Sequence, residues 1–272
     1  MGIMEAIKRG FGVASKNLLL IIVLFIFNLI WNMVNIALVP ATAMPPAAET
    51  PPAVPPEVAM MTLAFSALFI LISIFMQGGS LGVVRDYIKE GKMKLASFAS
   101  YGLKYYLRLL GLGLLIILLI VIIAIIASLI IAITTPLNNV IATVIASIIA
   151  ITIGLAGIYF VILLVMSPYA LVCDGSGVIS AMKRSMRIVK KAFWKVLLLL
   201  VLLMLIAIGI GFLLGIGAGL LTVLLPVRAG QIVIGVVNSL FNGYFGIVMM
   251  AAFMAFYLAL SAKEKTVAEK VF

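Results

Sequence analysis

Long apolar runs alternate with short polar segments along this chain. Six such runs cover roughly residues 18–39, 58–77, 109–133, 140–166, 196–225 and 232–262. A helix needs about 20 apolar residues to cross the hydrocarbon core of a bilayer, and every run reaches that length. The pattern therefore predicts an all-α integral membrane protein with six transmembrane helices.

Composition agrees with this prediction. Of the 272 residues, 66% are hydrophobic and 10% are charged, whereas soluble domains average about 45–50% apolar and about 25% charged residues. So large an apolar excess does not fit inside a globular core. We therefore expect a multi-pass protein of the cell membrane.

The formal net charge of +11 is distributed unevenly. Of the 19 Lys and Arg residues, all except Arg228 fall in the N-terminal segment, in the loops after the second and fourth runs, or in the tail. Basic residues concentrate in cytoplasmic loops. The distribution therefore predicts that both termini are cytoplasmic, and it points to anionic membrane lipids as the partner rather than nucleic acid.

The basic segments also suggest an internal repeat. Residues 4–9 resemble residues 179–184, and the last basic residues before alternate runs, Lys16, Arg108 and Lys195, recur at intervals of 92 and 87 residues. Such a period is typical of repeated structural units. We predict one membrane domain, 1–272, built from three tandem helical hairpins at about 1–90, 91–177 and 178–272. Each hairpin would begin with an amphipathic cytoplasmic helix at the membrane interface.

The third of these amphipathic segments has the clearest pattern. Turn-forming residues at 174–177 precede it, and Ser176 is a candidate cap for a helix that begins at about Val178. One face is apolar: Ile179, Met182, Met186, Val189 and Phe193. The other carries the candidate lipid-headgroup residues Lys183, Arg184, Arg187, Lys190 and Lys191. Such a helix lies in the headgroup plane, either as a lipid site or only as a basic collar that sets the topology. Residues 95–108 show a similar pattern, with Leu95, Phe98, Tyr101 and Tyr105 as the apolar stripe.

Polar residues inside three of the runs are candidates for the lining of a passage. They are Asn28, Asn32 and Asn35 in the first run, Ser66 and Ser73 in the second, and Asn238 and Asn242 in the sixth. An amide in hydrocarbon needs a partner, so these faces must meet protein or water. Both readings remain open: a neutral, hydrated path, or hydrogen bonds that hold the helices together.

Small residues recur at every fourth position of the fifth run: Ala207, Gly211, Gly215 and Gly219. A ridge of this kind allows another helix backbone to approach closely. We expect it to serve helix packing within one chain or in a homo-oligomer.

Several chemistries lack the residues they require. The chain has no His and a single Cys, Cys173, so no cluster of ligands exists for zinc or an iron–sulfur centre. All eight acidic residues lie outside the apolar runs, which argues against intramembrane proteolysis and proton coupling. We therefore expect no enzymatic activity, no catalytic residues, no metal and no cofactor.

Two stretches carry a resemblance to known proteins. One contains residues 78–82, Gly91, Lys92, Phe98 and residues 104–110, and the other contains residues 168–171 and 177–195. Together they resemble uncharacterised six-span prokaryotic membrane proteins related to the membrane domain of glycerophosphodiester phosphodiesterases. The resemblance implies a membrane fold but no hydrolytic activity, because the phosphodiesterase active site belongs to a separate soluble domain that is not present here.

The sequence thus favours a pore or passive transport path with a neutral lining, formed within one subunit or at the axis of a homo-oligomer. The alternative is a non-transporting membrane scaffold or an accessory protein that binds anionic lipids.

Overall fold

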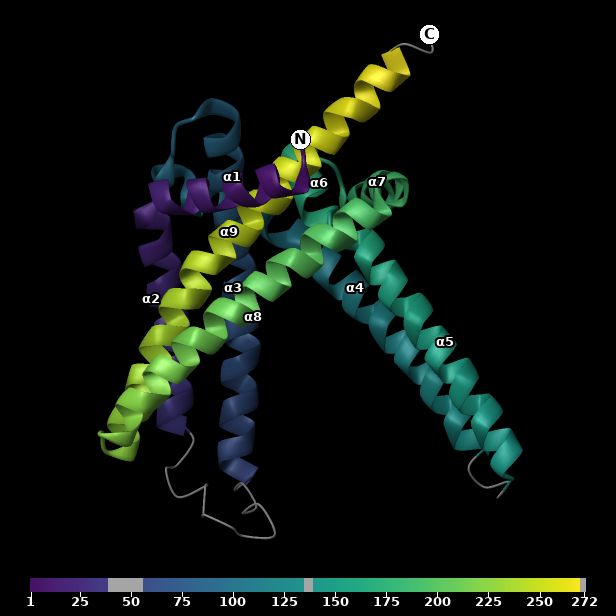
Figure 1. Ribbon diagram of the computed structural model, residues 1–272, viewed down its shortest axis with the longest axis horizontal. Helices are drawn as coiled ribbons and strands as arrows, with labels where there is room; N and C mark the ends of the chain where they lie inside the picture. Colours follow the sequence, from purple (N-terminus) through teal and green to yellow (C-terminus); the bar gives the residue numbers. More distant parts are fainter. Residues whose placement is uncertain (39–55, 135–138, 270–272) are drawn as a thin grey trace. The chain divides into compact units, whose positions relative to one another are not determined.

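The computed structural model describes residues 1–38, 56–134 and 139–269, and within these ranges the regular secondary structure is entirely helical (Figure 1). The elements are α1 (Ile3–Lys16), α2 (Leu18–Leu38), α3 (Pro56–Glu90), the short 3₁₀ helix η2 (Leu95–Ser97), α4 (Phe98–Thr134), α5 (Val140–Leu164), α6 (Ser167–Asp174), α7 (Val178–Lys191), α8 (Phe193–Val223) and α9 (Val227–Glu269).

Six helical segments are long and apolar enough to cross a membrane, which confirms the predicted class. They are Leu18–Ala37, Pro56–Glu90, Leu95–Thr134, Val140–Asp174, Phe193–Val223 and Val227–Ala262. Most extend well beyond the apolar run that predicts them, because a helix continues for as long as its backbone can bond and does not stop at the edge of the hydrocarbon.

The chain divides into two compact units. Unit 1 comprises residues 1–105 and 198–259, and unit 2 comprises residues 106–197 and the chain from Leu260 onward. Helices α4, α8 and α9 each contribute residues to both units.

Unit 1 is centred on a buried stretch of α9. Residues 251–257 are all at most 2% exposed, and α1 adds the buried residues Ala6 and Ile7. Two glycines allow this packing. A Cβ on Gly10 of α1 would lie 2.6 Å from the carbonyl oxygen of Val248, and one on Gly243 of α9 would lie 3.0 Å from the amide nitrogen of Phe25. At both positions α9 meets a neighbour so closely that a side chain cannot be inserted without a shift.

A second close contact in unit 1 joins α3 to the start of α4. The ring of Phe98 lies 2.8 Å from where a Cβ on Gly79 would stand, and the Tyr101 side chain occupies the corresponding space at Gly82. In return, Gly102 of α4 receives the ring of Phe75, 2.5 Å from a Cβ built there. The glycines of α3 therefore form a notch for two aromatic side chains.

This contact corrects the expectation for residues 95–108. They do not form a separate interfacial helix: η2 is followed by α4, which runs without a break from Phe98 to Thr134. Tyr105, expected on a lipid-facing stripe, is 1% exposed. The apolar periodicity of residues 95–108 therefore reflects contact with protein, since the spacing of apolar residues is the same whether they face protein or lipid.

Unit 2 contains α5, α6 and α7, of which α7 begins at Val178 as predicted. Gly175 ends α6 in the left-handed conformation, at φ 66°. The expected Ser176 cap is wrong, because Gly177 occupies the cap position and Ser176 Oγ donates instead to the carbonyl of Ala170 at 3.5 Å.

Candidate functional site

The three asparagines of α2 lie in a row along one face of the helix. Each side-chain nitrogen donates to the carbonyl four residues earlier: Asn28 to Leu24 at 2.7 Å, Asn32 to Asn28 at 3.0 Å, and Asn35 to Trp31 at 2.8 Å. Donors in a membrane helix are thereby satisfied without water. The side-chain carbonyl oxygen of each amide retains its capacity to accept a bond.

One of these amides also connects two helices. Asn32 Nδ2 donates to Ser239 Oγ on α9 at 2.9 Å, and Ser239 Oγ is buried and donates to the Gly235 carbonyl at 2.6 Å. Gly235 makes room for this contact, since a Cβ there would lie 3.4 Å from the Asn32 Cβ. Asn32 therefore joins α2 to α9 by a hydrogen bond at this point of unit 1.

Beside this contact, α2 and α9 enclose an open groove of about 280 Å³. We call it the amide groove; it is lined by Asn32, Asn35, Ile36, Gln231, Ile234, Gly235 and Asn238. Four of the seven lining residues carry an uncharged amide and none is ionisable, so the groove can both donate and accept hydrogen bonds while carrying no net charge.

The structure brings together only part of the predicted lining. Asn32, Asn35 and Asn238 line the amide groove, whereas Asn28 and Asn242 lie outside it on the same two helices. Gln231 was missed by the sequence reasoning, although it lies seven residues before Asn238 and therefore on the same side of α9. It directly precedes the sixth apolar run, 232–262, and was therefore assigned to the turn before that run, whereas α9 already begins at Val227.

Ser66 and Ser73 belong to a different surface. They lie on α3, which meets α2 through stacked aromatic rings: the Phe69 centroid lies 4.3 Å from that of Phe27 and 4.2 Å from that of Trp31. Ser73 Oγ donates to the carbonyl of Ile70 at 2.7 Å in its own helix. Neither serine lines the amide groove.

Beyond the amide groove, α2 and α9 are in close backbone contact. Five residues beyond Asn238, a Cβ on Gly243 would lie 3.0 Å from the Phe25 amide nitrogen and 3.3 Å from the Ile21 carbonyl oxygen. Backbone contact of this kind leaves no space for a solute. Solute therefore cannot pass between α2 and α9 at Gly243 in this conformation.

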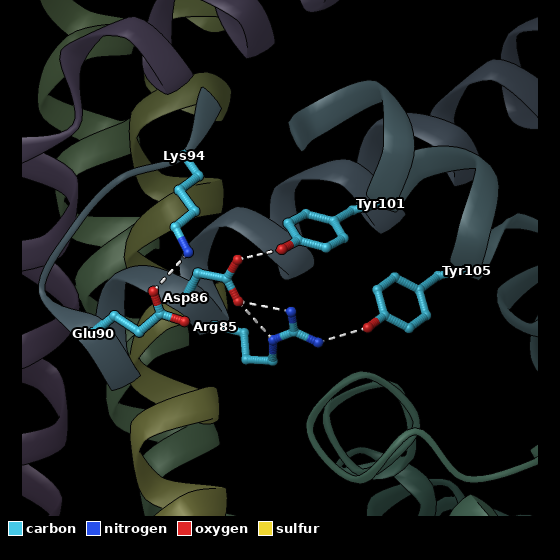
Figure 2. Close-up of polar contacts among 6 residues, drawn as sticks. All are labelled: Arg85, Asp86, Glu90, Lys94, Tyr101 and Tyr105. Carbon is cyan, nitrogen blue, oxygen red and sulfur yellow. Dashed lines mark hydrogen bonds and ion pairs between the residues drawn. The ribbon is translucent and has the colours of Figure 1, made fainter. Parts of the chain in front are cut away.

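A second polar site lies where α3 meets α4 (Figure 2). The Asp86 carboxylate, 5% exposed, accepts from the Tyr101 hydroxyl and from Arg85 Nε and Nη2 at 2.9 and 2.7 Å. Arg85 Nη1 donates to the Tyr105 hydroxyl at 2.6 Å, and the guanidinium lies 5.1 Å from the centroid of the Tyr101 ring. We call Arg85, Asp86, Tyr101 and Tyr105 the Asp86 cluster.

The Asp86 cluster was missed by the sequence reasoning, which counted Asp86 and Arg85 as loop charges. The available signal was a neighbouring acid and base directly after the glycine-rich segment 78–82, followed by two tyrosines four residues apart. Close by, Lys94 donates to Glu90 at 2.8 Å on the surface, and this hydrogen bond raises the pKa of Lys94.

In α7 the five predicted headgroup residues have different environments. Arg184 Nε lies 2.9 Å from Asp174 Oδ2 and its Nη2 donates to Ser261 Oγ at 2.7 Å, while Lys191 Nζ lies 3.5 Å from Glu264 Oε1. Lys183, Arg187 and Lys190 are exposed. Two of the five cations are thus engaged by protein groups, and three face outward.

The buried face of α7 also differs from the predicted stripe. It consists of Ala181, Ser185, Ile188 and Val189, with Ser185 Oγ donating to the Leu163 carbonyl at 2.7 Å. Ile179 is 63% exposed. The surface of α7 therefore has three sectors: one packs against protein, one is apolar and faces outward, and one is basic.

The small-residue ridge of α8 is mostly open within the described part of the chain. A Cβ on Gly211 would lie 3.9 Å from the Phe241 ring, but one on Gly215 or Gly219 would meet nothing within 4 Å. Ala207 lies one turn before Gly211. Close helix packing at Gly215 and Gly219 therefore remains a prediction.

Among the described residues, no group of three His, Cys, Asp or Glu side chains is placed to hold a metal ion.

Comparison with known proteins identifies a family for the chain. No curated protein and no solved structure shows a significant match to the chain. A family model described as a domain of unknown function, DUF7847, matches residues 1–260. The match covers nearly the whole chain, and the protein therefore belongs to the DUF7847 family.

Proposed function

We propose that this multi-pass membrane protein provides a neutral passive path for small uncharged polar solutes, with the amide groove as its entrance. The observation that carries the proposal is the convergence of Asn35, Gln231 and Asn238 on one open groove within a segment of membrane-spanning length and composition. Amides replace water as both donors and acceptors, which lowers the cost of dehydrating a polar solute.

The lining also favours uncoupled movement. Proton- and sodium-coupled transporters place carboxylates or unwound helices at membrane depth. The groove has neither, since its residues lie in the continuous helices α2 and α9. Solute would then follow its own gradient.

Beyond Ser239 the path requires α2 and α9 to separate, because Gly243 packs directly on the α2 backbone. The Asn32–Ser239 hydrogen bond, 2.9 Å long, would act as the latch of that contact. An interhelical bond of this kind contributes only about 0.6 kcal/mol in a membrane, weak enough to open thermally.

The test is solute flux into liposomes containing the purified full-length protein, with water, urea and glycerol as probes. Asn35→Leu combined with Asn238→Leu should reduce flux to that of protein-free liposomes, because leucine removes the hydrogen-bonding lining. Asn242→Leu is the matched control: the same change on α9, outside the groove, should retain flux. Equal flux in all three proteins would sink the proposal.

We further propose an orientation with both termini in the cytoplasm of the cell, and with α1 and α7 as interfacial helices. The support is the placement of all Lys and Arg residues except Arg228 in the terminal segments and in every second loop between spans, which lie on one side of a six-span protein. The three tandem hairpins and a homo-oligomer belong to the same proposal, with the open α8 ridge at Gly215 and Gly219 as the contact between copies.

A second candidate function is that of a membrane scaffold or accessory protein that binds anionic lipids. The outward-facing basic sector of α7, formed by Lys183, Arg187 and Lys190 beside the exposed Ile179, favours it. Each such cation near an anionic surface contributes about 1 kcal/mol. Neutralising these three residues to Gln should then weaken binding of the protein to anionic lipid in mixed micelles, whereas unchanged binding would remove α7 as the lipid site.

A further inference from the structure

A smaller pocket in unit 1 lies where α1 meets the end of α3. Its volume is about 190 Å³, and it is lined by Arg9, Gly12, Val13, Lys16, Tyr87 and Ile88. We call it the α1–α3 pocket. It is separate from the amide groove and shares no residue with it.

The pocket has two cations and no acidic lining residue. The acids nearest in sequence are engaged elsewhere: Glu5 Oε2 accepts from the Gly2 amide at 3.3 Å, Asp86 belongs to the Asp86 cluster, and Glu90 pairs with Lys94. No ion pair given for the described residues includes Arg9 or Lys16. The pocket therefore has an uncompensated positive charge.

The two walls are held in fixed positions. Arg9 Nη2 donates to the Ile88 carbonyl of α3 at 3.4 Å, which leaves most of the five guanidinium donors available. Gly10 brings α1 onto α9, and Ser15 Oγ lies 3.3 Å from the Tyr244 hydroxyl. A ligand would thus meet a preformed site and would not need to order a loose helix.

The pocket also lies next to a membrane-spanning segment. Lys16 is the last residue of α1, and α2 begins at Leu18, from which it descends steeply in Figure 1. Leu18 and Leu19 are exposed by 65% and 60% beside it. A pocket lined by basic and phenolic side chains, with exposed leucines following Lys16 in the sequence, matches a lipid whose headgroup is anionic.

We propose that the α1–α3 pocket binds the phosphate ester of an anionic phospholipid. Arg9 and Lys16 pair with the phosphate oxygens, the Tyr87 hydroxyl donates to the ester, and the acyl chains lie along the exposed leucines at the start of α2. A zwitterionic lipid binds more weakly, because its own ammonium group already compensates the phosphate.

The test measures lipid binding to the full-length protein in detergent by native mass spectrometry, with dioleoyl phosphatidate and dioleoyl phosphatidylcholine as probes. The double variant Arg9→Gln, Lys16→Gln should bind phosphatidate roughly thirtyfold more weakly, since each of the two cations near an anionic lipid contributes about 1 kcal/mol and about 1.4 kcal/mol is a factor of ten. The control Lys8→Gln, Lys92→Gln removes the same charge outside the pocket and should bind within about twofold of the unmodified protein.

A third variant fills the pocket without changing the charge. Gly12 lines it and a Cβ there meets nothing within 4 Å, so we expect the leucine side chain of Gly12→Leu to extend into the ligand's space, with thermal unfolding in detergent as the check that the variant is folded. It should weaken phosphatidate binding to the level of the double variant. Binding equal to that of the unmodified protein in Gly12→Leu, or an equal loss in the control, would overturn the proposal.

Two soluble probes distinguish the source of the phosphate. Inorganic phosphate and glycerol phosphate, at the concentration of phosphatidate that half-saturates the protein, should leave the lipid bound. Displacement by either would overturn the assignment to a phospholipid. The amide groove is intact in every variant. The basic sector of α7 is also intact in every variant, so any phosphatidate bound there stays the same throughout and only the difference between the pocket variants and the control tests the pocket.

Discussion

At the scale of single residues, the Asp86 carboxylate stands out as a buried acidic group that accepts three hydrogen bonds. It accepts from two nitrogens of Arg85 and from the Tyr101 hydroxyl, and Arg85 in turn bonds Tyr105. A buried charge is tolerated only when its lone pairs are satisfied in this way. The cluster therefore fixes the start of α4 against α3.

Removing this carboxylate should destabilise unit 1. Asp86→Ala leaves the Arg85 guanidinium, 17% exposed, without its acid, and we expect a loss of about 3 kcal/mol from the free energy of unfolding. Glu90→Ala is the matched control on the same helix: its ion pair with Lys94 is half exposed on both sides and is screened by solvent, so its removal should cost much less stability. Denaturant titration in detergent measures both. Similar losses in the two variants would show that Asp86 is not the anchor.

At the scale of elements, the spans were predictable and their partners were not. Apolar length alone predicts six helices, because the bilayer fixes the minimum. Which face of each helix meets protein depends on residues distant in sequence, as when Gly79 receives Phe98 and Gly243 receives the backbone of Phe25. The same limit explains α7, whose buried Ala181 and Ser185 look no more apolar than its exposed Ile179.

The candidate sites follow the same rule. The amide row on α2 was visible in the sequence because asparagine is unusual inside an apolar run. The hydrogen bond between Asn32 and Ser239, and the presence of Gln231 in the same groove, depend on how α2 and α9 pack. The α1–α3 pocket was not visible at all, since Arg9 and Tyr87 meet only in the folded unit.

Two glycines of α1 give a direct test of how that helix docks. Gly10→Ala places a methyl group 2.6 Å from the Val248 carbonyl oxygen, and backbone cannot yield easily, so a loss of about 1–3 kcal/mol is expected. Gly12→Ala meets nothing within 4 Å and should instead gain about 0.8 kcal/mol from helix propensity. Thermal unfolding in detergent, followed by tryptophan fluorescence, compares the two. An equal shift in both variants would contradict the docking of α1 on α9.

At the scale of the whole molecule, sidedness decides what each site can meet. The amide groove lies toward the Val227 end of α9, whereas the α1–α3 pocket and the basic sector of α7 belong to segments rich in Lys and Arg. If those segments are cytoplasmic, the groove opens outward and both lipid sites contact the inner leaflet, which carries the anionic lipids.

Cysteine labelling tests that arrangement. In a Cys173→Ser background, Ser180→Cys on α7 and Arg228→Cys at the start of α9 each place one thiol at an exposed position. The positive-inside rule puts them on opposite sides. A membrane-impermeant maleimide should therefore label Arg228→Cys in intact cells, and label Ser180→Cys only after permeabilisation. The reverse pattern would show that the protein has the opposite orientation. The α1–α3 pocket would then lie against the outer leaflet, and the amide groove would open toward the cytoplasm.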